Sequence, residues 1–251
     1  MPTVKTVDRA IDLLECFSAE RPELGVGDLA TLLGIDKSGA SRMAATLRER
    51  RFLQMDKTSR RYRIGARMHE LARLFDRRES LSQIAVPQLR ALVREVAHAS
   101  HVGVLDGPDV LIVACVESEQ QLQVAVQVGE RRALHATAAG KLFLAFGADN
   151  LLQDLSNGGR LPMVGPKTID TVTKMNRELA SVRREGMAYN REESARGVGA
   201  VAAPIYGADK TIAASLTTIF PLALVDQAEW VRIGNHVRRT ADRISALLVS
   251  A

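Results

Sequence analysis

The segment from residue 26 to residue 50 constrains the fold of this chain more than any other part of it. A short apolar stretch over 26–33 ends at Gly34, and glycine readily adopts the left-handed conformation with which many helices end. Asp36 then occupies the position of a helix N-cap. The apolar positions that follow recur at three- and four-residue spacing and are Ala40, Met43, Ala44 and Leu47. Two helices joined by a tight glycine turn predict a helix-turn-helix.

The third helix has a polar face of unusual composition. A first amphipathic helix is predicted from the spacing of Val4, Val7, Ile11, Leu14 and Phe17, so the basic helix after Asp36 is the third. Its polar positions are Lys37, Ser38, Ser41, Arg42, Ala45 and Thr46. No acidic residue lies between Asp36 and Glu49, although a helix that merely faces water usually mixes its charges. The pattern favours contact with a polyanion.

A β-hairpin is predicted directly after the basic helix. Two apolar runs, 52–55 and 62–65, flank the short polar loop 56–61. A hairpin in this position is the wing of a winged helix-turn-helix. Its loop arginines, Arg60 and Arg61, are placed to contact phosphates or an adjacent minor groove.

The positive charge of the chain is concentrated in this region. Residues 36–67 contain ten basic and three acidic residues, whereas the whole chain of 251 residues carries a net charge of only +5. Such a concentrated basic stretch indicates a polyanionic partner, and a solvated, highly charged face is the alternative explanation. Aromatic residues make up only 4% of the chain, so stacking platforms for single-stranded nucleic acid or RNA are not evident.

A connecting helix is predicted over about 66–78. Its apolar seam is narrow and consists of Met68, Leu71, Ala72 and Phe75. A helix between two domains has little of its own to bury against, so this seam favours self-association. Packing of the helix on its own C-terminal domain is the alternative.

The second half alternates helices and strands. Helices are predicted over 84–97, 137–146 and 171–184, with a last helix around Trp230. Strands are predicted over 102–105, 110–116, 122–128, 198–205 and 211–219. Because several of these strands are joined by short turns such as 106–109, the pattern indicates an α+β fold with helices flanking the sheet.

Motifs for catalysis or metal binding are missing from this half. The sequence has no GxSxG, no GxxxxGK[ST], no HExxH and no CxxC, and Cys16 and Cys115 lack zinc spacing. His101 and His135 show no ligand spacing either, and the adjacent Glu192 and Glu193 are expected to be solvated loop residues. We therefore expect no enzyme, no metal and no cofactor. The lack of a signal peptide and of long apolar runs predicts a cytoplasmic chain without membrane contact.

The segment 134–141 is the most informative part of the second half. Small residues surround Thr137 immediately before a predicted helix, which would leave backbone N–H groups open at a positive helix terminus. Such a terminus is a suitable site for a carboxylate. The alternative is that Ala139 and Gly140 simply allow the helix to pack closely on the sheet.

Several of these segments together resemble the IclR family of bacterial transcriptional regulators. The similar segments are 6–14, 29–38, 62–65, 134–141, 192–204 and 213–221. The resemblance implies a winged helix-turn-helix DNA-binding domain (1–66), a linker helix (67–82) and a GAF-like effector-binding domain (83–251). It also implies a homodimer or homotetramer. One departure is Gly39, which stands where the family commonly has threonine in the recognition helix.

The resemblance also implies an effector site. The family's effector contacts match the loop at Ala138 and Ala139 and the positions of Asn190, Ala200, Thr217 and Ile219 in this chain. Asn190 replaces a common acid, Ala200 a common cysteine and Ile219 a common serine. A site that is less acidic and more apolar favours an aromatic or amphipathic carboxylate as the effector.

The sequence thus predicts a ligand-responsive regulator that binds a near-palindromic duplex operator. Ser38, Ser41 and Arg42 are expected to approach base edges. Phosphate contacts are expected from Lys37, Arg48, Arg60 and Arg61. An enzyme with an appended nucleic-acid-binding module and an architectural or RNA-binding protein are the alternatives.

Overall fold

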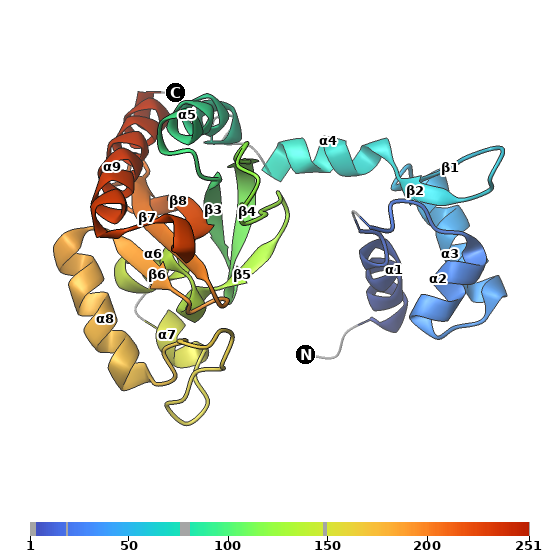
Figure 1. Cartoon of the computed structure of the whole chain (residues 1–251). Helices are drawn as coiled ribbons and strands as arrows, with labels where there is room; N and C mark the ends of the chain where they lie inside the picture. The colour runs from blue at the N-terminus through green and yellow to red at the C-terminus, as the bar shows by residue number, and fades with distance from the viewer. Residues whose placement is uncertain (1–3, 19, 76–80, 148–149, 251) are drawn as a thin grey trace. The chain divides into compact units, whose positions relative to one another are not determined.

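The computed structural model of the chain describes residues 4–18, 20–75, 81–147 and 150–250 (Figure 1). The chain forms two compact units, 1–79 and 80–251. The division between them falls within the predicted linker helix 67–82, of which residues 76–80 lie outside the described part. The boundaries at 66 and 82 therefore stay predictions.

The first unit combines helices with a small antiparallel sheet (Figure 1). Its elements are α1 (Lys5–Glu15), α2 (Val26–Leu33), α3 (Lys37–Glu49), β1 (Leu53–Met55), β2 (Tyr62–Ile64) and α4 (Ala66–Phe75). Leu53 pairs with Ile64 and Met55 with Tyr62, so the loop 56–61 is the tip of a hairpin. This arrangement confirms the predicted winged helix-turn-helix.

Local chemistry explains where α2 ends and α3 begins. Gly34 has φ of 62°, a left-handed conformation that costs glycine little. The Asp36 carboxylate accepts the Gly39 N–H at 2.8 Å and so caps α3. The core beneath them is built mainly from small and aliphatic side chains, namely Leu13, Cys16, Leu24, Leu29, Ala30, Ala40, Ala44, Leu53 and Tyr62.

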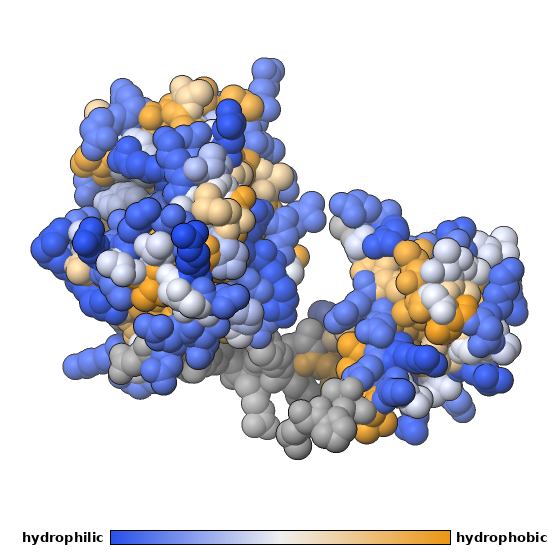
Figure 2. Space-filling model, turned by 90° about the horizontal axis from the view of Figure 1, so that it is seen from below, coloured by the Kyte–Doolittle hydropathy of each residue, from blue (hydrophilic) through white to orange (hydrophobic). Residues whose placement is uncertain are grey.

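Helix α1 is amphipathic as predicted, but most of its apolar stripe faces outward. Leu13 is its buried residue, whereas Val4, Val7 and Ile11 are 66%, 55% and 49% exposed. Figure 2 shows hydrophobic residues gathered among hydrophilic ones on the surface of this unit. Within the first unit, the core therefore leaves one apolar side of α1 uncovered.

The second unit is built on a six-stranded antiparallel sheet with the order β5-β4-β3-β8-β7-β6 (Figure 1). The strands are β3 (Ser100–Asp106), β4 (Asp109–Val116), β5 (Arg131–Ala133), β6 (Ala188–Arg191), β7 (Val198–Tyr206) and β8 (Ile212–Pro221). The helices are α5 (Leu81–Val96), α6 (Ala138–Phe146), α7 (Leu151–Asp154), α8 (Val172–Glu185) and α9 (Gln227–Ser250), with short 3-10 turns η1 (Leu134–Ala136) and η2 (Leu222–Leu224). The predicted α+β class with a GAF-like second domain is confirmed.

Each face of this sheet has its own core. Helices α5 and α9 cover one face, where Leu89, Leu216 and Ile233 are buried together. Helices α6 and α8 cover the other face, where Phe143, Met175 and Ala202 are buried together. Almost every residue of α6 is buried because the helix lies between the sheet and α8, which explains its nearly continuous apolar sequence.

The predicted strand over 122–128 is wrong. These residues form an irregular connection in which Leu122 and Val128 are exposed and Val126 is buried. Pairing with β4 is regular only from Arg131 onward, opposite Leu111. Alternation of apolar and polar residues produces a strand only where a neighbouring strand pairs with its backbone. Here the outer edge of β4 is paired with β5 at three residues only.

In the part of the chain that the structure describes, no helix combines the length and the apolar character that a membrane span requires.

Candidate nucleic-acid interface and effector site

The predicted DNA-contacting side chains all lie on the surface of the first unit. Those exposed residues are Lys37, Ser38, Ser41, Arg42, Arg48, Arg60 and Arg61. Ala40 and Ala44, on the opposite side of α3, are fully buried, so the helix is held by its small residues and presents its polar face outward. The arrangement leaves the polar face of α3 free to meet a ligand.

Two of these residues also have internal partners. The Ser38 hydroxyl donates to the Asp36 carboxylate at 2.5 Å. This hydrogen bond and the one from the Gly39 N–H both lower the pKa of Asp36. The Arg61 guanidinium donates to the Asp28 carboxylate of α2 at 2.8 Å. The structure thus gives Ser38 a part in the α3 cap and Arg61 a part in tying the wing to α2. Their DNA contacts stay predictions.

The tip of the wing is ordered by a single carboxylate. Asp56 accepts hydrogen bonds from the Thr58 and Ser59 N–H groups at 2.9 and 2.7 Å, and these bonds lower the pKa of Asp56. Arg60 has φ of 58° and its side chain is exposed. A backbone fixed in this way holds Arg60 at the end of the hairpin without an internal ion pair in the described residues.

A groove with a volume of about 490 Å³ lies between α1 and α3. Its charged lining residues are Lys5 and Arg9 from α1, and Asp36 and Arg42 from α3. Gly39 also lines it, and a Cβ at this position would lie 3.0 Å from an oxygen of the Asp36 carboxylate. Sequence reasoning did not single out Lys5 and Arg9, because the net charge of the α1 segment is not positive.

In the second unit, the residues predicted to contact an effector lie together. Strand pairing places Asn190 of β6 opposite Ala200 of β7, and Ala200 opposite Ile219 of β8. Thr217 lies two residues from Ile219 on the same side of β8. Ala138 and Ala139 begin α6, which packs over this face of the sheet. The structure therefore brings all six predicted positions to one buried face, which we call the α6 face.

The start of α6 supports the packing explanation, and the carboxylate site stays a prediction. Thr137 accepts the Gly140 N–H at 3.1 Å, so the cap occupies one of the N–H groups expected to be open. A Cβ at Gly140 would lie 2.0 Å from the Leu134 carbonyl oxygen, which shows that glycine is required for close packing. The Ala138 and Ala139 N–H groups have no acceptor within the described residues.

Asn190 is held on both ends of its amide. Its Nδ2 donates to the Ala136 carbonyl at 2.7 Å, and its Oδ1 accepts the Glu193 N–H at 3.2 Å. The side chain is buried, so these bonds fix the segment before α6 to the end of β6. This internal role of Asn190 does not follow from the family resemblance.

A buried ion-pair network lies beside Asn190. The Lys141 ammonium donates to Glu178 of α8 and to Glu193, each at 2.8 Å. Burial raises the pKa of Glu193, and the nearby Lys141 opposes that rise. The expectation that Glu193 is solvated is wrong. Glu192 instead pairs with exposed Lys167, so the two adjacent carboxylates point to different partners. A lysine within the apolar run 138–146 is the sequence signal that could have indicated this network.

Four buried side-chain atoms in the described residues have no hydrogen-bond partner. They are His101 Nδ1, His135 Nδ1, Thr217 Oγ1 and Glu193 Oε2. Unpaired buried polar atoms are rare in folded proteins, because a buried donor or acceptor without a hydrogen bond costs about 1–3 kcal/mol of stability. All four belong to the sheet, loop or turn segments on the α6 face or at its edge.

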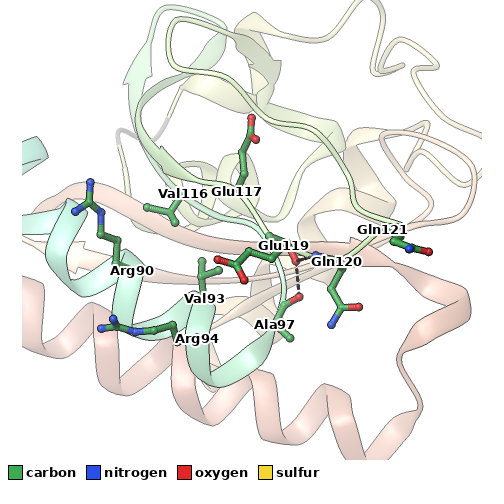
Figure 3. A pocket seen from close by; sticks show the side chains of 10 residues that line it. Arg90, Val93, Arg94, Ala97, Val116, Glu117, Glu119, Gln120 and Gln121 are labelled. Carbon is green, nitrogen blue, oxygen red and sulfur yellow. Dashed lines mark hydrogen bonds between the residues drawn. The ribbon is translucent and has the colours of Figure 1, made fainter.

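A separate pocket of about 650 Å³ lies at the end of α5 (Figure 3). Arg90 and Arg94 of α5 stand on one side of it, and Glu117, Glu119 and Gln120 follow β4 on the other. Ser118, which also lines the pocket, donates its hydroxyl to the Ala97 carbonyl at 2.7 Å. None of the predicted effector residues and none of the four unpartnered atoms lines this pocket. Among the described residues, no group of three or more His, Cys, Asp or Glu is placed to hold a metal ion.

An exposed basic helix with a wing, followed in the same chain by an α+β domain with unpartnered polar atoms on a covered sheet face, defines a DNA-binding regulator with a sensor domain. The model of the IclR helix-turn-helix domain matches residues 6–57. The model of the C-terminal domain of bacterial transcriptional regulator IclR matches residues 76–246. The chain therefore belongs to the IclR family of bacterial transcriptional regulators.

Individual relatives support the same assignment. The chain is 26% identical over 248 residues to the HTH-type transcriptional regulator XynR of Escherichia coli K12, covering 99% of this chain and 98% of XynR. It is 26% identical over 242 residues to the regulator BhcR of Paracoccus denitrificans, covering 96% and 86% of the two chains. These relatives are transcriptional regulators.

Solved structures share the whole fold. An IclR homolog from Microbacterium hydrocarbonoxydans, crystallised in complex with 4-hydroxybenzoate, superposes with a TM-score of 0.87 at 23% identity over 98% of this chain and 99% of the other. The IclR of Thermotoga maritima gives a TM-score of 0.79 at 23% identity over 97% and 98%.

Proposed function

We propose that this regulator reads a near-palindromic operator with α3 and the wing, and responds to a carboxylate metabolite bound on the α6 face. Ser38, Ser41 and Arg42 contact base edges in the major groove, and Lys37, Arg48, Arg60 and Arg61 neutralise phosphates. The observation that carries this proposal is the exposed polar face of α3, which is basic and free of acidic side chains between Asp36 and Glu49.

Two copies of the chain bind one operator. The exposed apolar side chains of α1 and the exposed Met68 and Leu71 of α4 offer surface for self-association within the DNA-binding unit. The predicted seam residues Ala72 and Phe75 have side chains outside the described part. A two-fold dimer presents two identical recognition helices, so the operator has two related half-sites, and further pairing through sensor domains gives a homotetramer.

The effector carries a carboxylate that binds at the start of α6. The Ala138 and Ala139 N–H groups point out of a helix N-terminus, where a negative charge is stabilised. Asn190, Ala200, Thr217 and Ile219 on the neighbouring sheet are uncharged, and Lys141 and Glu193 beside Asn190 are paired with each other. An aromatic or amphipathic acid fits these surroundings, and the 4-hydroxybenzoate bound by the Microbacterium homolog makes that compound a suitable first probe.

Selection of duplexes from a randomised pool by the full-length protein tests the DNA part. The selected DNA should contain two related half-sites about one helical turn apart or a multiple of that distance. Fluorescence anisotropy with the selected duplex then tests the effector part, with 4-hydroxybenzoate and aliphatic acids compared with their uncharged amides.

A carboxylate should change operator affinity and its amide should not. Binding of only neutral or cationic compounds would contradict the helix-terminus site, and selection of unpaired RNA over duplex DNA would favour the RNA-binding alternative. No arrangement of the described residues favours the enzyme alternative, since Glu192 and Glu193 are engaged with different lysines.

A further inference from the structure

His101 lies in the middle of the α6 face, next to a predicted effector residue. It pairs in register with Thr217 of β8 on one side and with Cys115 of β4 on the other. Directly paired residues in neighbouring strands project from the same face, so the three side chains form one row across the sheet. His101 is 6% exposed and Thr217 is 3% exposed. Sequence reasoning gave His101 no functional role, because cross-strand neighbours are not visible in a single sequence.

Both members of this row that carry strong polar groups are unsatisfied. His101 Nδ1 and Thr217 Oγ1 are buried and have no hydrogen-bond partner within the described residues. The neighbouring hydroxyl on β8 behaves differently, since Thr218 Oγ1 and Ser100 Oγ are paired at 2.8 Å on the opposite face. The strand therefore satisfies its other buried threonine and leaves Thr217 open.

The electrostatic setting of His101 keeps its imidazole neutral. Burial lowers the pKa of His101 to about 3, and the charge of Arg132 adds to this effect. Arg132 is itself ion-paired with Glu130. At neutral pH His101 therefore presents one N–H donor and one nitrogen acceptor, and no positive charge to pair with a carboxylate.

We propose that His101 and Thr217 form a second polar contact of the effector site, which receives an uncharged hydroxyl group, so that the effector is a hydroxylated carboxylic acid. This inference rests on the proposed carboxylate site at the start of α6. A hydroxyl both donates and accepts, so it can complete Nδ1 in either tautomer together with Thr217 Oγ1. A carboxylate only accepts, so it can complete Nδ1 only in the tautomer that carries the proton on that nitrogen.

Isothermal titration of the full-length protein with matched pairs of acids tests the inference. The probes are benzoate and 4-hydroxybenzoate, propionate and lactate, and hexanoate and 6-hydroxyhexanoate. The variants are Thr217→Val and His101→Phe, which remove the polar atoms while keeping approximate shape. Thr218→Val is the matched control, because it makes the same change one residue away on the other face.

In at least one pair, the wild-type protein should bind the hydroxylated acid at least about tenfold more tightly than its partner, since a site built for a hydroxyl rejects ligands that lack it. Thr217→Val and His101→Phe should each remove most of that preference, because each lowers the affinity for the hydroxylated acid more than the affinity for the plain acid. Thr218→Val should keep the preference. Without ligand, Thr217→Val should keep or raise the Tm, because an unpaired hydroxyl is lost, whereas Thr218→Val should lower it.

Two outcomes would overturn the inference, and they are distinguishable. If plain and hydroxylated acids bind equally, or if the preference survives in both variants, the hydroxyl contact is wrong while the carboxylate site stands. If no acid of any pair binds, the proposed carboxylate site is wrong and the hydroxyl contact falls with it.

Discussion

At the scale of single residues, the two units use polar side chains in opposite ways. In the first unit the basic residues Arg42 and Arg60 are exposed and have no ion-pair partner among the described residues. In the second unit Asn190 and Lys141 are buried and fully engaged with other parts of the chain. Exposure without a partner leaves a side chain available to a ligand, whereas burial with partners fixes the fold.

Arg42→Ala and Arg60→Ala should therefore have different effects on DNA binding. Arg42 lies on the polar face of α3, so its loss should reduce discrimination at one base pair by roughly 1–3 kcal/mol. Arg60 lies at the tip of the wing, so its loss should weaken all duplexes alike and reduce the salt slope by about one. Titration of selected and scrambled duplexes over a range of salt concentrations measures both. Equal effects of the two variants on both duplexes would contradict this division of roles.

Asn190→Ala should destabilise the second unit. It removes the donor to the Ala136 carbonyl and the acceptor for the Glu193 N–H, leaving buried groups unpaired. The expected loss is about 2–4 kcal/mol of unfolding free energy. Urea unfolding followed by the fluorescence of Trp230, the single tryptophan of the chain, reports on this unit. Exposed Asn157→Ala is the control and should stay within about 0.5 kcal/mol. Matching losses in both variants would contradict the role of Asn190 in fixing the segment before α6 to the end of β6.

At the scale of elements, local chemistry made the helices predictable. Gly34 and Asp36 mark helix ends in the sequence, and the structure uses them as caps. The strand predicted over 122–128 failed because strand formation depends on a partner that sequence periodicity does not show. The position of His101 beside Thr217 was missed for the same reason, since register joins residues more than a hundred positions apart. The predicted effector positions came from the family resemblance, and strand pairing explains why they converge.

Gly140→Ala should displace α6 from its packed position and destabilise the second unit. The added Cβ would lie 2.0 Å from a backbone oxygen of Leu134, and backbone cannot move aside as a flexible side chain can. We expect a loss of more than 2 kcal/mol, by analogy with other overpacked core sites. Gly186→Ala is the matched control, because its Cβ meets open space and only its left-handed backbone is strained, at a cost of about 1 kcal/mol. Chemical denaturation followed by Trp230 fluorescence compares the two variants. A loss of unfolding free energy in Gly140→Ala no larger than in Gly186→Ala would mean that α6 does not pack tightly against Leu134.

At the scale of the whole molecule, one buried histidine should affect acid stability. The folded pKa of His101 is about 3 against an ordinary 6.5, with Thr217, Cys115 and Arg132 as its neighbours. Above pH 6.5 the ring is neutral in both folded and unfolded chains, so it contributes no pH dependence. Below pH 6.5 only the unfolded chain takes up the proton, and unfolding free energy falls by about 1.4 kcal/mol per pH unit.

Comparison of the wild-type protein with His101→Phe isolates this contribution. Between pH 7.5 and pH 4.5 the wild-type protein should lose about 2–3 kcal/mol more unfolding free energy than the variant. Urea titrations at the two pH values, followed by Trp230 fluorescence, provide the measurement. An identical pH dependence in the two proteins would show that His101 is not held neutral in the folded state.

The central claim for the whole molecule is that two copies of α3 enter the major groove of one operator. Methylation interference on the selected duplex tests it most directly, because dimethyl sulfate modifies guanine N7 in the major groove. Methylation should block binding at guanines in both half-sites, related by two-fold symmetry, and Arg42→Ala should remove part of this interference. Binding that tolerates methylation at every major-groove guanine, or no binding to duplex DNA at low ionic strength, would contradict it.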